Sequence, residues 1–255
     1  MRSPNKKQTL DKVISTLQVK HGPRIIETGS DVPQAVIPPC VSTGFGALDQ
    51  LTGCKGIPLG HTTLFTGKTT SGKLTLAYKV LANAQGSGKR KDSVAVLDLT
   101  HASDPGYNEA CGIDLEHTLF VRPPVPEQAV RLIYNLLKGY SLRALLVDGL
   151  ADLLRTPPIA RDFDAALPYL SQALRTSRCA LICLDEPCPP WLAWTRLGSA
   201  AIAHTASLHI DLRRERWIEE CDGALTGYSA QAQVVRSKWA RGNKGCMLDI
   251  EVCAP

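Results

Sequence analysis

The chain has 255 residues, 44% of them hydrophobic, and its 29 Lys and Arg against 24 Asp and Glu give a formal net charge of +5. This length is enough to bury one substantial core, and so small a positive charge only mildly favours an anionic partner. The sequence shows no run of roughly 18 uncharged apolar residues and no signal peptide, so we expect a cytoplasmic protein with no membrane partner.

The N-terminal segment predicts a short amphipathic helix over residues 8–20. Its apolar side chains recur at helical spacing: Leu10, Val13, Ile14 and Leu17. The stretch that follows is rich in Pro and Gly and predicts an extended linker. We therefore expect an N-terminal helix and linker over residues 1–40 and a core domain over residues 41–255. A helix separated from the core in this way is expected to contact a neighbouring protomer or another partner.

In the expected core, short apolar runs alternate with helical patterns. Strands are predicted at residues 61–67, 93–99, 117–123, 144–150 and 180–186. Helices are predicted at residues 73–85, 126–140 and 163–177. This alternation indicates a parallel sheet covered by helices on both faces, the α/β class. Three later segments, 207–217, 230–240 and 244–252, predict antiparallel strands at one edge.

The nine cysteines include no C-x-x-C pair. A zinc site usually shows paired close spacings, so we expect buried reduced thiols rather than metal binding by Cys179, Cys183 and Cys188.

Residues 67–74 read GKTTSGKL and resemble a phosphate-binding loop, G-x-x-x-x-G-K followed by Ser or Thr. A predicted strand precedes the loop and a predicted helix follows it, which places the backbone donors of a helix N-terminus at the phosphates. The alternative is an ordinary Gly/Thr/Ser turn before a helix. The final hydroxyl, which would bind Mg²⁺, is replaced by Leu74. Thr75 does not simply replace it, because successive helical residues point about 100° apart.

The run ALLVDGL, residues 144–150, predicts a buried strand that presents Asp148 at its carboxyl end. In nucleoside triphosphatases such an aspartate helps to hold Mg²⁺. The alternative is an aspartate that begins a turn or caps the next helix.

Together these segments resemble the RecA recombinase family over about residues 8–251. The resemblance rests on VSTGFGALDQLTGCKGIPLGHTTLFTGKTTSGKLTLAYKV, LDLTHASDPGYNEACGIDLEHTLFVRPPVPEQA, LLVDGLADL, SLHIDLRR and QVVRSKWA. It implies a RecA-like P-loop core with a mostly parallel sheet, antiparallel edge strands and an N-terminal helical arm on which protomers pack. We do not expect the family's C-terminal domain in this chain, which stops just after CMLDIEV.

The resemblance implies that ATP-holding groups are largely retained. Lys73 matches the loop lysine, Asp148 the metal-associated aspartate, and Asp104 with Tyr107 the adenine contacts. Arg236 and Lys238 match two lysines that reach the neighbouring protomer's nucleotide. The expected nucleotide-binding residues are Gly67, Ser71, Gly72, Lys73, Thr75, Asp104, Tyr107, Asp148, Arg236 and Lys238. The alternatives are that Tyr107 caps the sheet and that the two edge-strand cations are solvated.

The groups that would hydrolyse ATP depart from the family pattern, and we assign no catalytic residue. Where the family ends its third strand with D-x-E-H, this chain has Thr100, which cannot act as a carboxylate base. Leu74 removes the metal-binding hydroxyl. Where the family has N-Q, this chain has Asp185 and Glu186, and a carboxylate there repels phosphate oxygens unless a cation intervenes. We therefore expect weak or static ATP binding, with Asp148 as the remaining candidate metal ligand and Mg²⁺ binding left open.

Two loops of the family contact DNA, and they map to residues 154–161 and 187–204. The second contains Trp191, Trp194 and Arg196, a set suited to stacking on the bases of single-stranded DNA and to contacting phosphate. The alternative is that the tryptophans dock on a protein partner. Residues 86–92 and the cluster Arg213, Arg214 and Arg216 are expected to be solvated, with DNA contact as the second interpretation.

These features favour a hydrolysis-impaired RecA-like protein that binds nucleotide and DNA and acts in DNA repair or homologous recombination. It would modulate or scaffold an assembly formed with itself, another RecA-like protein or a repair polymerase. The alternative is an active ATP-dependent strand-exchange recombinase, and a third is a protein of the same fold unrelated to DNA. Whether the chain is an enzyme is left open at this point.

Overall fold

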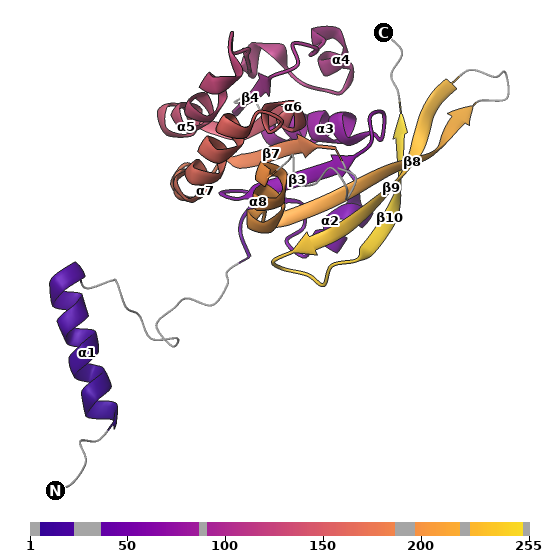
Figure 1. Ribbon diagram of the computed structural model, residues 1–255. Helices are drawn as coiled ribbons and strands as arrows, with labels where there is room; N and C mark the ends of the chain where they lie inside the picture. Colours follow the sequence, from indigo (N-terminus) through magenta and orange to yellow (C-terminus); the bar gives the residue numbers. More distant parts are fainter. Residues whose placement is uncertain (1–5, 23–36, 87–90, 187–196, 220–224, 252–255) are drawn as a thin grey trace, which may run out of the picture. The chain divides into compact units, whose positions relative to one another are not determined.

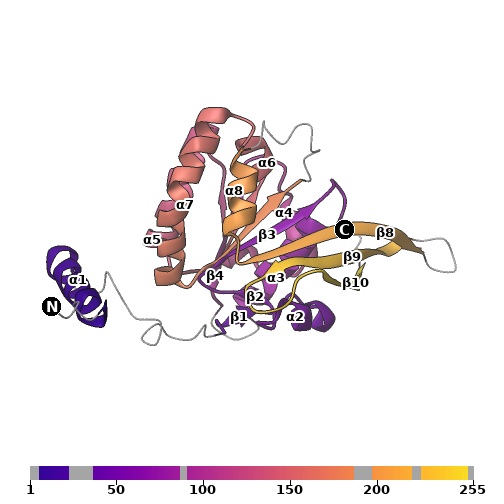
Figure 2. The ribbon, with the colours of Figure 1, turned by 60° about the horizontal axis from the view of Figure 1, so that its bottom comes forward.

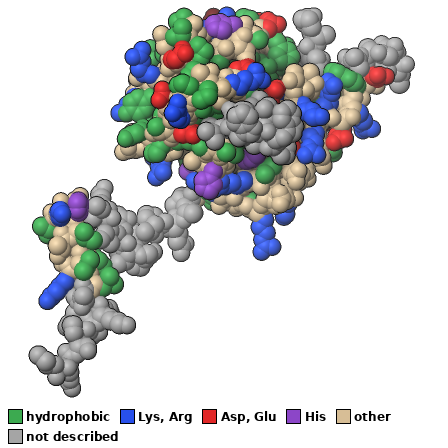
Figure 3. Space-filling model, viewed as in Figure 1, with side chains coloured by type: hydrophobic (Ala, Val, Ile, Leu, Met, Phe, Trp, Pro, Cys, Tyr) green, Lys and Arg blue, Asp and Glu red, His purple; other side chains and the backbone are tan. Residues whose placement is uncertain are grey.

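The computed structural model describes residues 6–22, 37–86, 91–186, 197–219 and 225–251. The chain divides into two compact units, Met1–Ile37 and Pro38–Pro255. In the first unit the expected helix is present as α1 (Lys6–His21). Its side chains Leu10 and Val13 are 58% and 50% exposed, and Figure 3 shows hydrophobic side chains on its surface. Contact of this helix with a protomer or partner stays a prediction.

The second unit is built on an eight-stranded sheet in the order β10-β9-β8-β3-β7-β6-β4-β5 (Figure 1). Its strands are β3 (Thr62–Gly67), β4 (Ser93–Asp98), β5 (Thr118–Val121), β6 (Leu142–Asp148), β7 (Ala180–Asp185), β8 (Leu208–Glu219), β9 (Leu225–Ser237) and β10 (Lys244–Glu251). The strands from β8 to β5 are parallel, and β9 and β10 are antiparallel additions. A two-stranded sheet pairs β1 (Cys40–Val41) with β2 (Ile57–Pro58). The α/β class with antiparallel edge strands is confirmed.

Helices cover both faces of the sheet (Figure 2). One face packs against α2 (Gly46–Thr52), α3 (Lys73–Gln85) and α4 (Pro105–Ala110). The other packs against α5 (Ala129–Gly139), α6 (Leu150–Leu153), α7 (Pro157–Ser177) and α8 (Leu197–Thr205). Short 3-10 turns lie at Leu115–His117 and Pro126–Gln128. Among the helices of the described ranges, none combines the length and apolar character needed to cross a membrane.

Residues 94–97 of β4 are a continuous apolar run because both faces of the strand are buried. In β4, Val94 and Val96 belong to the core cluster on the α3 face, whereas Ala95 and Leu97 belong to the cluster on the α7 face. Successive side chains of a strand point to opposite faces of its sheet. A strand covered on both faces therefore has no polar position to alternate, and the run in the sequence has none.

Three segments differ from the expectation. β8 pairs in parallel with β3 and so extends the parallel sheet, while its other edge pairs with β9 in the antiparallel sense. The expected DNA-contacting loop over residues 154–161 is largely helical, because α7 begins at Pro157. Proline suits the first turn of a helix, where no N–H donor is required. The second expected loop ends earlier than predicted, at the start of α8, and its Trp191, Trp194 and Arg196 lie outside the described residues.

Candidate functional site

The register of the parallel strands gathers the predicted site at one edge of the sheet. Thr66 of β3 is level with Asp185 of β7, and Asp98 of β4 is level with Asp148 of β6. The segments that leave these strands surround a cavity of about 600 Å³. The predicted residues that line it are Ser71, Gly72, Lys73, Leu74, Thr75, Thr100, Tyr107, Asp148 and Glu186.

The loop between β3 and α3 has a conformation that demands glycine. Gly72 has φ 93°, in the left-handed region, and a Cβ there would lie 2.8 Å from the hydroxyl of Tyr228. A Cβ on Gly67 would lie 2.4 Å from Oγ of Ser71. The Ser71 hydroxyl is buried and has no hydrogen-bond partner among the described residues. Gly72 also caps α3 without a side chain, which leaves first-turn N–H groups to an anion. The loop therefore fits a phosphate group.

The ammonium group of Lys73 lies across the loop. Its Nζ donates to the carbonyl oxygens of Gly67 at 3.1 Å and Lys68 at 3.3 Å, and it forms an ion pair with Oε1 of Glu186 at 3.4 Å. The same Oε1 accepts a hydrogen bond from Oγ1 of Thr69 at 2.8 Å. Glu186 thus places a carboxylate beside the ammonium group of Lys73, and in loops of this type that lysine neutralises phosphate.

Thr75 and Tyr107, both expected to contact nucleotide, bind each other. Their hydroxyl oxygens lie 2.6 Å apart, and Oγ1 of Thr75 also accepts a hydrogen bond from the hydroxyl of Tyr228 at 2.9 Å. Burial raises the pKa of Tyr107 to about 12, so this hydroxyl keeps its proton at neutral pH. The Tyr107 ring meets Tyr78 edge-on, with centroids 6.0 Å apart. Both hydroxyls are therefore occupied in a network at one wall of the cavity.

The ionised forms of two neighbouring carboxyl groups at this edge, Asp98 and Asp148, are stabilised to different degrees. Burial tends to raise the pKa of Asp98, but hydrogen bonds from the backbone of Ser103, from Arg122 and from Thr100 outweigh it and hold that pKa below 3.8. For Asp148, fewer interactions offset the cost of burying the charged form. Burial, reinforced by the charge of Asp98, raises the pKa of Asp148 above its ordinary value.

The donor set does not fit Mg²⁺ well. A direct hydroxyl ligand is replaced by the side chain of Leu74, and the neighbouring hydroxyl of Thr75 is held by two tyrosines. Asp148 offers a carboxylate whose proton affinity is increased. Mg²⁺ prefers oxygen ligands in a nearly ideal octahedron, and this wall supplies few of them. We derive no role for a metal here.

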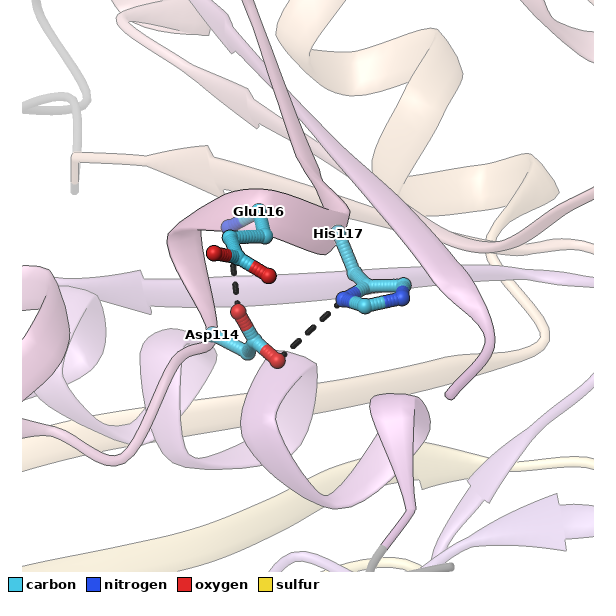
Figure 4. A group of neighbouring side chains, drawn as sticks. All are labelled: Asp114, Glu116 and His117. Carbon is cyan, nitrogen blue, oxygen red and sulfur yellow. Dashed lines mark hydrogen bonds and ion pairs between the residues drawn. The ribbon is translucent and has the colours of Figure 1, made fainter. Parts of the chain in front are cut away.

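A separate group, Asp114, Glu116 and His117, places ligand-type atoms within 4.8 Å of one another (Figure 4). Oδ2 of Asp114 is bound by Nζ of Lys91 at 2.6 Å and lies 3.2 Å from Nδ1 of His117. Oδ1 accepts from the backbone N–H of Glu116 at 3.0 Å. A lysine already neutralises this carboxylate, so the group stabilises a turn. Cys179 and Cys183 are buried free thiols, and Cys188 lies outside the described residues.

Three predicted nucleotide ligands lie away from the cavity. Asp104 caps α4 by accepting from the backbone N–H of Gly106 at 2.9 Å. Arg236 donates to the backbone carbonyl of His204 at the end of α8, where a cation complements the helix dipole. Lys238 lines a different cavity, of about 280 Å³, which also includes His61. Whether Arg236 and Lys238 reach a neighbouring protomer's nucleotide stays a prediction.

Several residues of the cavity wall were not predicted from the sequence. They are Thr69, Asp152, Arg155, Leu184, Arg214, Trp217 and Tyr228. The guanidinium of Arg214 lies 4.5 Å from the ring centroid of Trp217, whose side chain is 47% exposed. Thr69 stands inside the loop motif and could have been found from it. The residues of β8 and β9 carry no spacing signal that connects them to the loop.

Replacing Asp148 by Asn is expected to stabilise the fold at pH 7 by about 0.5–2 kcal/mol. The folded-state pKa of Asp148 is raised, so its charge costs stability at neutral pH, and that cost disappears as the pH falls through the raised pKa towards 3.8. Urea unfolding at pH 7 and pH 4 measures the difference. The control, Asp152→Asn, removes a carboxylate of the same cavity that is paired with Arg155 at 2.9 Å, and should give no gain. Equal stability of Asp148→Asn and wild type at pH 7 would contradict the expectation.

Comparison with known proteins identifies the family. The model of the RecA N-terminal domain matches residues 8–182. Protein RecA of Roseiflexus castenholzii is 30% identical over 273 residues, covering 97% of this chain and 74% of that protein. Protein RecA of Brucella canis and that of Brucella suis are each 31% identical over 269 residues, covering 97% of this chain and 72% of theirs. Since the match spans most of the chain and most of each relative, the chain belongs to the RecA family.

Proposed function

We propose that this RecA-family protein acts in the cytoplasm in DNA repair or recombination, binds nucleotide and DNA, and hydrolyses ATP slowly or not at all. The carrying observation is the 3.4 Å ion pair between Lys73 and Glu186 in a loop that otherwise fits phosphate. The loop lysine is retained, but a carboxylate rather than a neutral side chain faces it. Leu74 and Thr100 supply neither a metal-binding hydroxyl nor a carboxylate base.

A second candidate is an active ATP-dependent recombinase. It is favoured by the retained glycines, by Lys73 and by Asp148, all of which border the same cavity or begin its loop. The two candidates make the same prediction for nucleotide binding and opposite predictions for turnover. Measuring both quantities on one preparation therefore separates them.

The purified protein is expected to bind nucleotide without appreciable DNA-stimulated hydrolysis. Loss of a general base alone typically lowers a rate by about 10²–10⁴-fold. Lys73→Ala should weaken nucleotide binding, whereas Lys79→Ala, a lysine on the same helix that lines another cavity, should not. Leu74→Thr combined with Thr100→Glu should recover part of the hydrolysis. Brisk wild-type turnover that Lys73→Ala abolishes would support the active recombinase instead.

DNA binding in this proposal depends on Trp191, Trp194 and Arg196. Exposed cations on β8 add an electrostatic contribution to the DNA affinity, although Arg213 already pairs with Asp211 at 3.2 Å. The face in Figure 3 shows basic, acidic and hydrophobic side chains interspersed. A local stacking loop is therefore a better candidate than a broad basic surface.

Replacing both Trp191 and Trp194 by Ala is expected to weaken single-stranded DNA binding by about tenfold or more, because each stacked base contributes about 1–3 kcal/mol. The control Arg213→Ala should have a smaller effect and should reduce the salt dependence. Titration of a labelled oligonucleotide at two salt concentrations measures both. Equal affinities of the double variant and wild type would remove this loop from DNA binding and favour docking of the tryptophans on a protein.

Helix α1 is proposed to join the protein to a second copy, another RecA-like protein or a repair polymerase. Replacing Leu10, Val13 and Leu17 by Ala removes three exposed apolar side chains that recur at helical spacing, while favouring the helix. Sedimentation with each partner should then show loss of a complex, whereas Lys12→Ala with Thr16→Ala should leave it intact. Unchanged assembly of the triple variant with every partner would show that the helix has another role.

A further inference from the structure

The pairing of strands in the sheet places Glu186 beside the loop that follows β3. The parallel ladder makes Thr66 and Asp185 Cα partners, so Gly67, the last residue of β3, and Glu186, the first residue after β7, lie at the same level of the sheet. The backbone N–H of Glu186 donates to Oδ1 of Asp185 at 2.8 Å, which fixes the start of the segment after β7. Its carboxylate then accepts from Thr69 within the loop at 2.8 Å.

The carboxylate of Glu186 contacts Lys73, the residue that reaches the outer phosphates of a nucleotide in loops of this type. In loops of this type the backbone N–H groups hold the α- and β-phosphates, and the lysine reaches the β- and γ-phosphates. Lys73 has three N–H donors, and it is close to two loop carbonyls and to Oε1 of Glu186. Ser71 is 3% exposed and its hydroxyl has no partner among the described residues, whereas the Glu186 side chain is 39% exposed; the first turn of α3 has no side-chain cap. The inner phosphate positions are thus open to a ligand, while the outer one already faces an anion.

We infer that Glu186 takes the place of a terminal phosphate and makes the site selective for nucleoside diphosphates over triphosphates. This inference rests on the proposed binding of nucleotide by the loop. A diphosphate satisfies the inner donors and leaves the Glu186 contacts with Thr69 and Lys73 in place. A third phosphate must displace the carboxylate from both groups or lie beside it, and like charges in contact oppose binding.

The test compares the affinities of ADP and ATP for the full-length wild type and for Glu186→Gln. Wild type should bind ADP about tenfold more tightly than ATP, a difference of about 1.4 kcal/mol. Gln retains an oxygen acceptor for Thr69 and Lys73 without the charge, so the preference should fall to about onefold or reverse, mainly through tighter ATP binding. Calorimetric titration of each nucleotide, with hydrolysis products monitored, gives the four dissociation constants.

The matched control is Glu109→Gln, which removes the same charge from an exposed side chain that does not line the cavity. It should leave the ratio of the two affinities unchanged. A second variant, Glu186→Ala, should lose the preference as Gln does, and urea unfolding verifies that each variant is folded. Equal or tighter wild-type binding of ATP, or a ratio that neither Glu186 variant changes, would overturn the selectivity while leaving nucleotide binding intact. Failure of wild type to bind either nucleotide would instead overturn the proposed function, and the selectivity with it.

Discussion

Pairing of β3 with β7 places the last residue of β3, Gly67, level with Glu186, the first residue after β7, and most features of the site depend on that register. A strand of this sheet that shifted by one residue would exchange the side chains on its two faces, and five of the strand pairings are parallel and buried. The loop after β3 must therefore meet the residue after β7. In this chain that residue is a carboxylate, and Lys73 and Thr69 bind it. The loop that we propose to bind an anion therefore already contacts a carboxylate of the same chain.

The same edge shows how the protein tolerates buried charge. Asp98 is fully buried, and Arg122 Nε contacts it at 3.0 Å while backbone N–H groups complete its shell. Its neighbour Asp148 is left with a raised pKa because burial and Asp98 both oppose its ionisation. Perturbed carboxyl groups in a cavity are typical of functional sites, where stability is lower than it could be. Neither Leu74 nor Thr100 carries a carboxylate, and the chemistry that we propose for this cavity is anion binding.

Much of the fold could be predicted from periodicity, and less of the site. The pattern over residues 73–85 matches α3 residue for residue, and the run 144–150 predicts β6 with both of its ends displaced by two residues, because both elements are strongly patterned by burial. The start of α7 was missed because a DNA-contacting loop of the family was mapped onto residues 154–161, whereas Pro157 and Pro158 begin the helix in this chain. The contact of Tyr228 with Thr75 joins positions 153 residues apart, and no local pattern reports such a pair. Likewise the sequence placed Glu186 at the end of a strand, but its contact with Lys73 is seen only in the structure.

A crystal structure of the full chain with ADP would test most directly the claim that one loop holds phosphate while its lysine keeps an internal anion. The account predicts diphosphate oxygens on the backbone N–H groups of residues 67–73, with the carboxylate of Glu186 still within hydrogen-bond distance of Thr69 and Lys73. A nucleotide bound outside the loop, or a diphosphate in the loop with Glu186 displaced into solvent, would contradict it.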